Sequence, residues 1–279
     1  MIILEGKTLS EQIILEQKGL AEKLKPVLAV ILVGENPASQ LYVRNKKRAC
    51  KKAGIETRDF IFSETVTQKE LLIQVEKCNA DPSIHGILVQ LPLPAQIDMN
   101  EIIRTIDPKK DVDGFHALNV GKACLGEENE GLPPATALGI LRLLDYYDIE
   151  LQGKHVVIVG HSNIVGKPAT LMMLNRNATV TTCNIYTPNL QEMTRMADIL
   201  ITAVGKENLI IGSMVKKGAV VIDVGINRKE DGTFCGDVNF EEVSKVAGAI
   251  TPVPGGIGPM TIAALILNII KAAQLQINR

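Results

Sequence analysis

Residues 156–170 read VVIVGHSNIVGKPAT, and this stretch decides the fold of the second half of the chain. An apolar run of β-forming residues leads into Gly160, a polar turn follows, and Gly166 and Pro168 open a helix. A strand that turns sharply into a helix presents free backbone N–H groups and a positive dipole end, which suits a dinucleotide pyrophosphate. Ser162 stands where the second glycine of the usual GxGxxG fingerprint would be, so an ordinary strand-to-helix connection remains an alternative.

Strand and helix patterns alternate on both sides of this stretch. A continuous apolar run at 27–33 predicts a strand buried on both faces, and a helix over 38–53 follows it. We therefore predict an α/β protein with two parallel sheets. Residues 1–118 are expected to form a substrate domain and residues 119–279 a Rossmann-like dinucleotide-binding domain. The strongly apolar last helix, about 259–279, is expected to return to the first domain.

Three local features refine this prediction. Thr67 is expected to cap the helix that starts after it. The segment 107–134 is rich in glycine, proline and charge, which predicts a loop that contains the domain transition. A helix over 135–147 is expected to follow it.

Composition excludes several classes of function. The chain has 3% aromatic residues, no Trp and a formal net charge of -1, which argues against a nucleic-acid partner. Its five cysteines are scattered without a CxxC pair, which indicates no zinc site and a reducing, cytoplasmic location. The N-terminus lacks the basic region and cleavage site of a signal peptide. The apolar run 262–270 is too short to span a bilayer and contains Asn268, so no membrane partner is expected.

The helix over 38–53 carries the first candidate for chemistry. At 3.6 residues per turn, Ser39, Tyr42 and Lys46 share one face directly after a buried strand. A solvated surface lysine is the alternative for Lys46 taken by itself. Short-chain dehydrogenases also carry a Tyr-x-x-x-Lys pair, but their glycine-rich turn precedes the pair, whereas here it follows.

Three further segments carry polar groups that suit a binding site. Gln90 ends an apolar strand, where side chains of a parallel sheet reach the ligand crevice, although it could simply mark the end of the strand. Asp111 and Asp113 share a face of an extended segment, but no third ligand is near them, so we predict no metal site. The loop 250–261, ITPVPGGIGPMT, is rich in proline and glycine and opens a helix, as many pocket-lining loops do, although a plain turn would also account for it.

These segments together resemble methylenetetrahydrofolate dehydrogenase/cyclohydrolase. They are SQLYVRNK at 39–46, VQLPLP at 89–94, KDVDGF at 110–115 and PGGIGP at 254–259, together with the turn at 160–168. The resemblance covers almost the whole chain in order, and PVPGGIGPMT is its most distinctive motif. It implies oxidation of 5,10-methylene-tetrahydrofolate with a nicotinamide cofactor, followed by hydrolysis of the methenyl product to 10-formyl-tetrahydrofolate.

The resemblance also implies roles for individual residues. Lys46 would be the catalytic lysine, Tyr42 would pack on the folate ring, Gln90 would adjust Lys46, and Asp113 would hold the polar edge of the pterin. The other implied substrate-binding residues are Ser39, Val89, Leu91, Pro254, Gly255, Gly256, Ile257 and Gly258. The implied cofactor-binding residues are Gly160, His161, Ser162, Ile185 and Ile226. Hydrolysis needs a lysine that works as a base at neutral pH, which desolvation or the positive charge of the methenyl substrate would favour.

Departures from the family pattern concern the cofactor. His161 stands where the family commonly has Arg, and Asn184 and Ile185 replace the His-Ser that follows Cys183. Arginine and serine would bind the 2′-phosphate of NADP, whereas the apolar side chain of Ile185 cannot. No acidic residue at 184–185 is present to bind a free 2′-hydroxyl, so NAD is not selected either. The family resemblance makes NADP the first expectation, and NAD stays open. Pro134–Ala135–Thr136–Ala137 replaces Pro-Cys-Thr-Pro, with no predicted consequence.

Other functions remain as alternatives to the bifunctional enzyme. They are a cyclohydrolase with weak or NAD-linked dehydrogenase activity, an amino-acid dehydrogenase of related build, and a non-catalytic folate- or nucleotide-binding protein. The family also implies a homodimer formed through the second domain.

Overall fold

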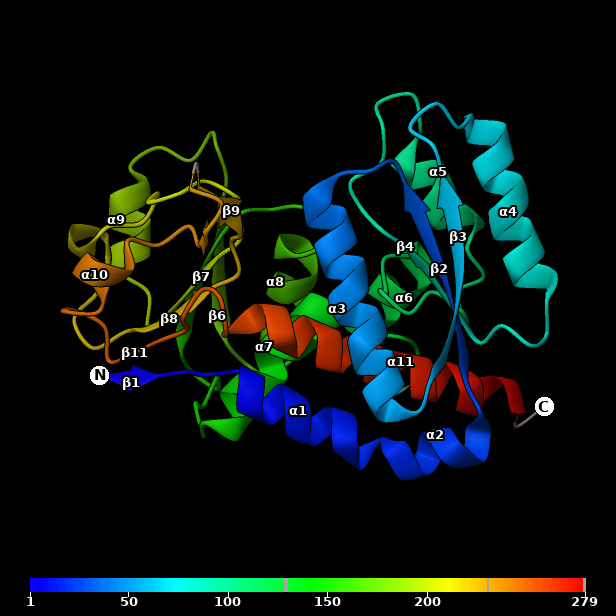
Figure 1. Cartoon of the computed structure of the whole chain (residues 1–279). Helices are drawn as coiled ribbons and strands as arrows, with labels where there is room; N and C mark the ends of the chain where they lie inside the picture. Colours follow the sequence, from blue (N-terminus) through cyan, green and yellow to red (C-terminus); the bar gives the residue numbers. More distant parts are fainter. Residues whose placement is uncertain (128–129, 230, 278–279) are drawn as a thin grey trace. The chain divides into compact units, whose positions relative to one another are not determined.

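The computed structural model describes residues 1–127, 130–229 and 231–277 (Figure 1). The proximity of Cα atoms divides the chain into two compact units. We call them the six-strand unit (1–10, 123–126 and 136–261) and the three-strand unit (11–122, 127–135 and 262–279), after their main sheets. The α/β class with parallel sheets, predicted from the alternating patterns, is confirmed in both units.

The three-strand unit contains the sheet β3-β2-β4, in which both neighbours run parallel to β2. The central strand β2 (Val27–Val33) is buried along its whole length, as its continuous apolar run predicts. Its neighbours are β3 (Glu56–Phe62), whose residues are half exposed, and the buried β4 (Gly86–Val89). The helices that lie wholly or mainly in this unit are α1 (Lys7–Glu16), α2 (Lys18–Leu24), α3 (Pro37–Ala53), α4 (Gln68–Ala80), α5 (Met99–Thr105), α6 (Ala117–Cys124) and most of α11 (Ile257–Ile277).

Two apolar cores hold this sheet, one on each face. On one face, β4 and β2 pack against helices α4 and α5 through residues such as Ile87, Leu71 and Ile102. The other core joins Leu28 to Leu265 and neighbouring apolar residues of α11. The C-terminal helix therefore packs on the sheet of the N-terminal half, as the sequence predicts.

Capping fixes where the helices of this unit begin and end. Thr67 and Glu70 form a reciprocal capping box at the start of α4, which confirms the predicted cap. Asn36 accepts hydrogen bonds from the backbone N–H groups of Ala38 and Ser39 and so starts α3. Gly54, at φ +80°, ends the same helix.

The six-strand unit contains a fully parallel sheet in the order β1-β11-β8-β7-β5-β6. Its strands are β1 (Ile2–Ile3), β5 (His155–Val159), β6 (Thr179–Cys183), β7 (Ile199–Thr202), β8 (Val220–Asp223) and β11 (Ala249–Ile250). A separate antiparallel pair is formed by β9 (Asn227–Arg228) and β10 (Phe234–Cys235). Its helical segments are α7 (Ala135–Tyr146), α8 (Gly166–Leu174), α9 (Leu190–Arg195), η1 (Gly212–Met214) and α10 (Phe240–Val243).

The order of these strands shows where a ligand site belongs. The chain goes from β5 outward to β6, then crosses back past β5 to continue through β7 and β8. The direction of progress therefore reverses between β5 and β7, which is the position where open α/β sheets bind ligands at the carboxyl ends of their strands.

One expectation differs from the structure, and one strand pairing was not predicted. The segment 107–134 is not entirely loop, because Ala117–Cys124 form α6. The N-terminal strand β1 pairs with β11 in the six-strand unit, a long-range partner that local sequence cannot reveal.

Helix α11 is also longer than the apolar run that predicted it. A segment of 20 residues within it, Ile257–Gln276, has mean hydropathy 1.4. By length and composition this segment could span a membrane, contrary to the expectation that the C-terminal apolar run is too short. However, 61% of this segment is buried within the structure, as in the core helix of a globular protein.

Candidate active site

Helix α3 positions the first group of predicted site residues. Asn36 caps this helix and Pro37 occupies its first turn. The helix therefore begins shortly after the buried strand β2. On its predicted face, Ser39 is buried and Tyr42 half-buried. Burial raises the pKa of the Tyr42 phenol, which keeps this side chain a neutral ring with a hydroxyl.

Lys46 lies one turn further along α3 and meets a carboxylate. Its Nζ is 3.6 Å from Oδ1 of Asp113, and the two side chains are only 11% and 13% exposed. An ion pair with so little solvent is screened less than a surface pair. The sequence placed these residues in separate motifs, and the structure brings them together.

The thiol one turn beyond Lys46 is not a competing reactive group. Burial raises the pKa of Cys50 to about 12, although the positive charge of Lys46 acts in the opposite direction. Cys50 is thus a neutral, apolar neighbour at physiological pH.

Gln90 follows β4 directly and keeps one polar atom available. The side chain is 8% exposed, and its Nε2 donates a hydrogen bond of 2.6 Å to the carbonyl of Leu91. Among the described residues, Oε1 is buried without a hydrogen-bond partner. A buried acceptor without a donor is costly, so this atom is suited to receive a hydrogen bond from a ligand or a moving side chain.

Asp111 and Asp113 do not act as a pair. Both oxygens of Asp111 are engaged by the chain: they accept hydrogen bonds from the backbone N–H groups of residues 114, 115 and 116 and from Nδ2 of Asn119. Asp111 is 2% exposed, and burial raises the pKa of its carboxyl. It therefore orders the turn that presents Asp113, a positioning role that the sequence did not reveal.

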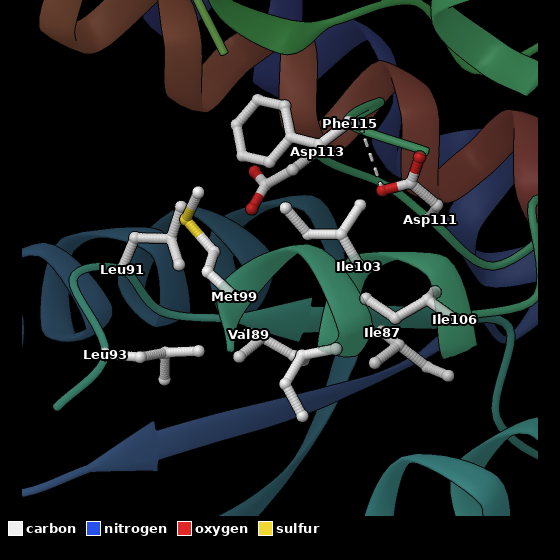
Figure 2. A pocket seen from close by; sticks show the side chains of 11 residues that line it. Ile87, Val89, Leu91, Leu93, Met99, Ile103, Ile106, Asp111, Asp113 and Phe115 are labelled. Atoms are coloured by element: carbon white, nitrogen blue, oxygen red, sulfur yellow. Dashed lines mark hydrogen bonds between the residues drawn. The ribbon is translucent and has the colours of Figure 1, made fainter. Parts of the chain in front are cut away.

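An apolar pocket lies beside these two aspartates (Figure 2). Val89 and Leu91, both predicted substrate residues, line it together with Asp113. Aliphatic side chains of α5 and the ring of Phe115 complete the lining. The pocket is small, about 10 Å³, so it offers an apolar surface with a carboxylate at its edge rather than a cavity that encloses a ring.

The backbone of the predicted cofactor turn requires glycine at two positions. Gly160 follows β5 at φ +115°, and a Cβ there would lie 2.3 Å from the carbonyl oxygen of Ala203. At Gly166 a Cβ would lie 2.0 Å from the carbonyl oxygen of Gly160. Both positions need glycine, and the turn starts α8 at the site that the strand order selects for a ligand.

The other predicted cofactor residues lie just after the ends of strands in the same sheet. His161 and Ser162 are exposed in the turn, and Ile185, just after β6, is 89% exposed. Ile226 follows β8 and is 41% exposed. Large apolar side chains that remain exposed at a ligand-binding edge are available to cover a planar ring.

The glycine-rich loop Pro254–Gly258 belongs to the six-strand unit, whereas Lys46, Gln90 and Asp113 belong to the three-strand unit. Gly255, at φ +115°, accepts a hydrogen bond from the N–H of Gly6. A Cβ at Gly256 would lie 2.7 Å from the carbonyl oxygen of Pro252. Gly255 and Gly256 therefore have structural reasons to be glycine.

One unit has a parallel sheet with a glycine turn at its switch point, and the other has a lysine–carboxylate pair beside an apolar pocket. These features are typical of two-domain nucleotide-dependent α/β enzymes. Residues 4–113 match the family model for the tetrahydrofolate dehydrogenase/cyclohydrolase catalytic domain, and residues 134–277 match that for its NAD(P)-binding domain. The chain belongs to the tetrahydrofolate dehydrogenase/cyclohydrolase family.

Individual relatives agree with this assignment over their whole lengths. The bifunctional protein FolD of Delftia acidovorans is 51% identical over 98% of this chain and 97% of its own length. The crystal structure of the bifunctional enzyme FolD of Campylobacter jejuni is similar with a TM-score of 0.95 and 51% identity, over 99% of each chain. The Trypanosoma brucei enzyme, solved with NADP and an inhibitor, has a TM-score of 0.95 at 33% identity and covers 100% of this chain and 99% of its own.

Proposed function

We propose that this protein oxidises 5,10-methylene-tetrahydrofolate to the 5,10-methenyl form with NADP and hydrolyses that product to 10-formyl-tetrahydrofolate. The observation that carries the proposal is the Lys46–Asp113 pair at 3.6 Å beside an apolar pocket, in a chain that matches both domains of the family. A lone surface lysine, the alternative interpretation of Lys46, does not explain its low exposure or its poorly exposed carboxylate neighbour.

In the hydrolytic step, Lys46 would assist attack of water on the methenyl carbon by holding and moving a proton at Nζ. The free Oε1 of Gln90 is a suitable acceptor for an N–H of Lys46 or of the substrate. Asp113 would accept hydrogen bonds from the polar edge of the pterin, and Tyr42 would cover its face. Ser39, Val89 and Leu91, together with the loop Pro254–Gly258, would complete the folate site.

In the oxidative step, the main task of the protein is to hold the one-carbon bridge against the nicotinamide. The chain fits such a group, because Gly160 and Gly166 allow the tight turn that leads from β5 into the N-terminus of α8, where a pyrophosphate can bind. When bound, NADP supplies the acceptor for the hydride. Gly160, His161 and Ser162 would hold its phosphates, while Ile185 and Ile226 would contact its rings.

The remaining features of the proposal follow from family and composition. NADP is the proposed cofactor, and NAD remains the alternative because His161 and Ile185 replace the phosphate-binding pattern. We also propose a cytoplasmic homodimer without nucleic-acid or membrane partners. Residues 1–118 and 119–279 are proposed as its catalytic and nucleotide-binding divisions.

A spectrophotometric assay tests the proposal directly. Methylene-tetrahydrofolate is supplied with NADP or with NAD, and formation and decay of the methenyl product are followed. Both phases should depend on the protein. Formation without accelerated decay would remove the cyclohydrolase. No formation, together with accelerated decay of separately added methenyl-tetrahydrofolate, would favour the cyclohydrolase alternative. The absence of both activities would favour a non-catalytic binding protein.

A further inference from the structure

Two buried aspartates in the six-strand unit have no place in the chemistry described so far. Asp223 is the last residue of β8 and is 3% exposed, and Asp237 precedes α10 and is fully buried. Buried carboxylates are costly unless hydrogen bonds satisfy them, so their partners show what they do.

Asp237 holds the loop that follows β7. Its carboxylate accepts hydrogen bonds from three consecutive backbone N–H groups, those of Val204 (2.7 Å), Gly205 (3.2 Å) and Lys206 (2.8 Å). A fourth donor is Nδ2 of Asn227, at 3.1 Å, in the strand that follows Ile226. One side chain thus joins the loops after β7 and β8.

Asp223 in turn holds the segment that carries Asp237. It accepts hydrogen bonds from the N–H groups of Gly225 (3.0 Å), Asp237 (3.0 Å) and Val238 (2.9 Å), and from Oγ1 of Thr202 (3.2 Å). The fit is close, because a Cβ at Gly225 would lie 2.1 Å from an oxygen of Asp237. Likewise, a Cβ at Gly236 would lie 1.9 Å from an oxygen of Asp223.

The loops held by this pair adjoin the cofactor turn. The N–H of Ala203 donates to the carbonyl of Val159 at the end of β5, and the carbonyl of Ala203 fills the space beside Gly160. These are the strands between which the sheet reverses its order. Movement of the loop after β7 would therefore disturb both the phosphate turn and the loop with Ile226.

We propose that Asp223 and Asp237 are positioning residues for the nicotinamide cofactor, because their carboxylates fix the loops 203–206 and 224–227 beside the Gly160 turn. The proposal rests on the cofactor site proposed above and adds the residues that shape it. It requires the charged form of Asp223, since a proton on this carboxyl would face four donors.

Burial raises the pKa of Asp223 to about 6, with the charge of Asp237 acting in the same direction. The ionisable groups that face Asp223 in the described chain are Asp237 and the thiol of Cys235, and the hydroxyls are those of Thr202 and Thr251. Since ordered loops need the carboxylate, cofactor affinity should fall as the pH is lowered through about 6.

The test measures binding of NADPH and of NADH by calorimetry, independently of folate turnover, so a failure of the proposed function does not affect it. D223N should raise the dissociation constant of the better-bound cofactor by about tenfold, because an amide replaces one acceptor by a donor. Cyclohydrolase activity without cofactor should stay within about twofold of wild type, since Lys46, Gln90 and Asp113, which would act in hydrolysis, belong to the other unit. The fall in affinity below about pH 6 should disappear in D223N, also with NADH, which has no titrating 2′-phosphate.

Two buried threonines provide a matched pair of milder variants in case D223N does not fold. Thr202 and Thr194 are both fully buried, but the hydroxyl of Thr202 donates to Asp223, whereas that of Thr194 donates to the carbonyl of Gln191 in its own helix. T202V should weaken cofactor binding about threefold and T194V should not. Wild-type affinity in folded D223N, equal weakening in T202V and T194V, or parallel loss of cyclohydrolase activity would each overturn the proposal.

Discussion

Asp113 in the three-strand unit and Asp237 in the six-strand unit are both poorly exposed aspartates close to the ends of parallel strands, but their surroundings are opposite. Asp237 receives four hydrogen bonds from the chain and is fully buried. Asp113 is 13% exposed, and in the described part of the chain its carboxylate has one ion-pair partner, Lys46, at 3.6 Å. The first carboxylate is occupied in ordering loops, and the second remains available to a ligand.

The same contrast holds between two other polar residues of the three-strand unit, Asp111 and Gln90. Asp111, two positions before Asp113, is saturated by backbone donors, while Oε1 of Gln90 has no donor among the described residues. Saturated polar groups stabilise a rigid frame, and unsaturated ones keep a cost that a ligand can relieve. The comparison teaches that hydrogen-bond saturation separates positioning residues from candidate catalytic residues better than residue type does.

The largest expected effect comes from the unsaturated side of this comparison. Lys46→Met should lower cyclohydrolase activity by at least about a hundredfold, because the proton-carrying group is lost while the aliphatic stem remains. Lys47→Met is the matched control: the neighbouring lysine is paired with Asp59 on a more exposed face of the same helix. Rates of methenyl decay, with melting curves to confirm folding, check the prediction. Unchanged hydrolysis in folded Lys46→Met would remove this residue from the mechanism.

The next largest effect is a difference in stability between variants of Asp111 and Asp113. Asp111→Asn should lower the free energy of unfolding by about 3 kcal/mol, because the new amide group faces backbone and Asn119 donors. Asp113→Asn should change it by less than about 1 kcal/mol, since within the described residues the carboxylate of Asp113 meets Lys46 and accepts no backbone hydrogen bond that orders a loop. Urea unfolding of both variants measures the difference.

Ligand binding should show the reverse order. Asp113→Asn should weaken folate binding by about tenfold, because charge-assisted hydrogen bonds to the pterin become neutral ones. Its affinity for the cofactor should change little. Similar stability losses in the two variants, or a wild-type folate dissociation constant for Asp113→Asn, would contradict the distinction between a saturated and an available carboxylate.

Much of this arrangement could be predicted from the sequence because it depends on local patterns. The apolar run of β2, the capping box at Thr67 and the glycine turn after β5 each follow from neighbouring residues. The alternation of such elements was enough to predict parallel sheets. The stripe of Ser39, Tyr42 and Lys46 followed from helical periodicity alone.

Other features depend on partners that are distant in the chain. The pairing of β1 with β11 joins residues about 247 positions apart, and no local pattern specifies it. The different roles of Asp111 and Asp113 depend on which backbone N–H groups fold around each carboxylate. Asp223 and Asp237 carried a weak signal, since each adjoins a glycine-containing turn, but only the structure shows that each fills the space where the other's glycine has no Cβ.

The smallest expected effect sharpens the comparison at the cofactor turn, where the side chains are exposed rather than saturated. His161→Arg combined with Ile185→Ser should raise the ratio of catalytic efficiencies with NADP over NAD by about tenfold, because a guanidinium and a hydroxyl can both bind a 2′-phosphate. Both positions are exposed, so the free energy of unfolding should change little. Steady-state kinetics with each cofactor gives the ratio, and the wild-type ratio is the control. If the ratio stays constant, these two side chains do not face the ribose, and the proposed cofactor site must be redrawn around other residues of the β5 and β6 edges.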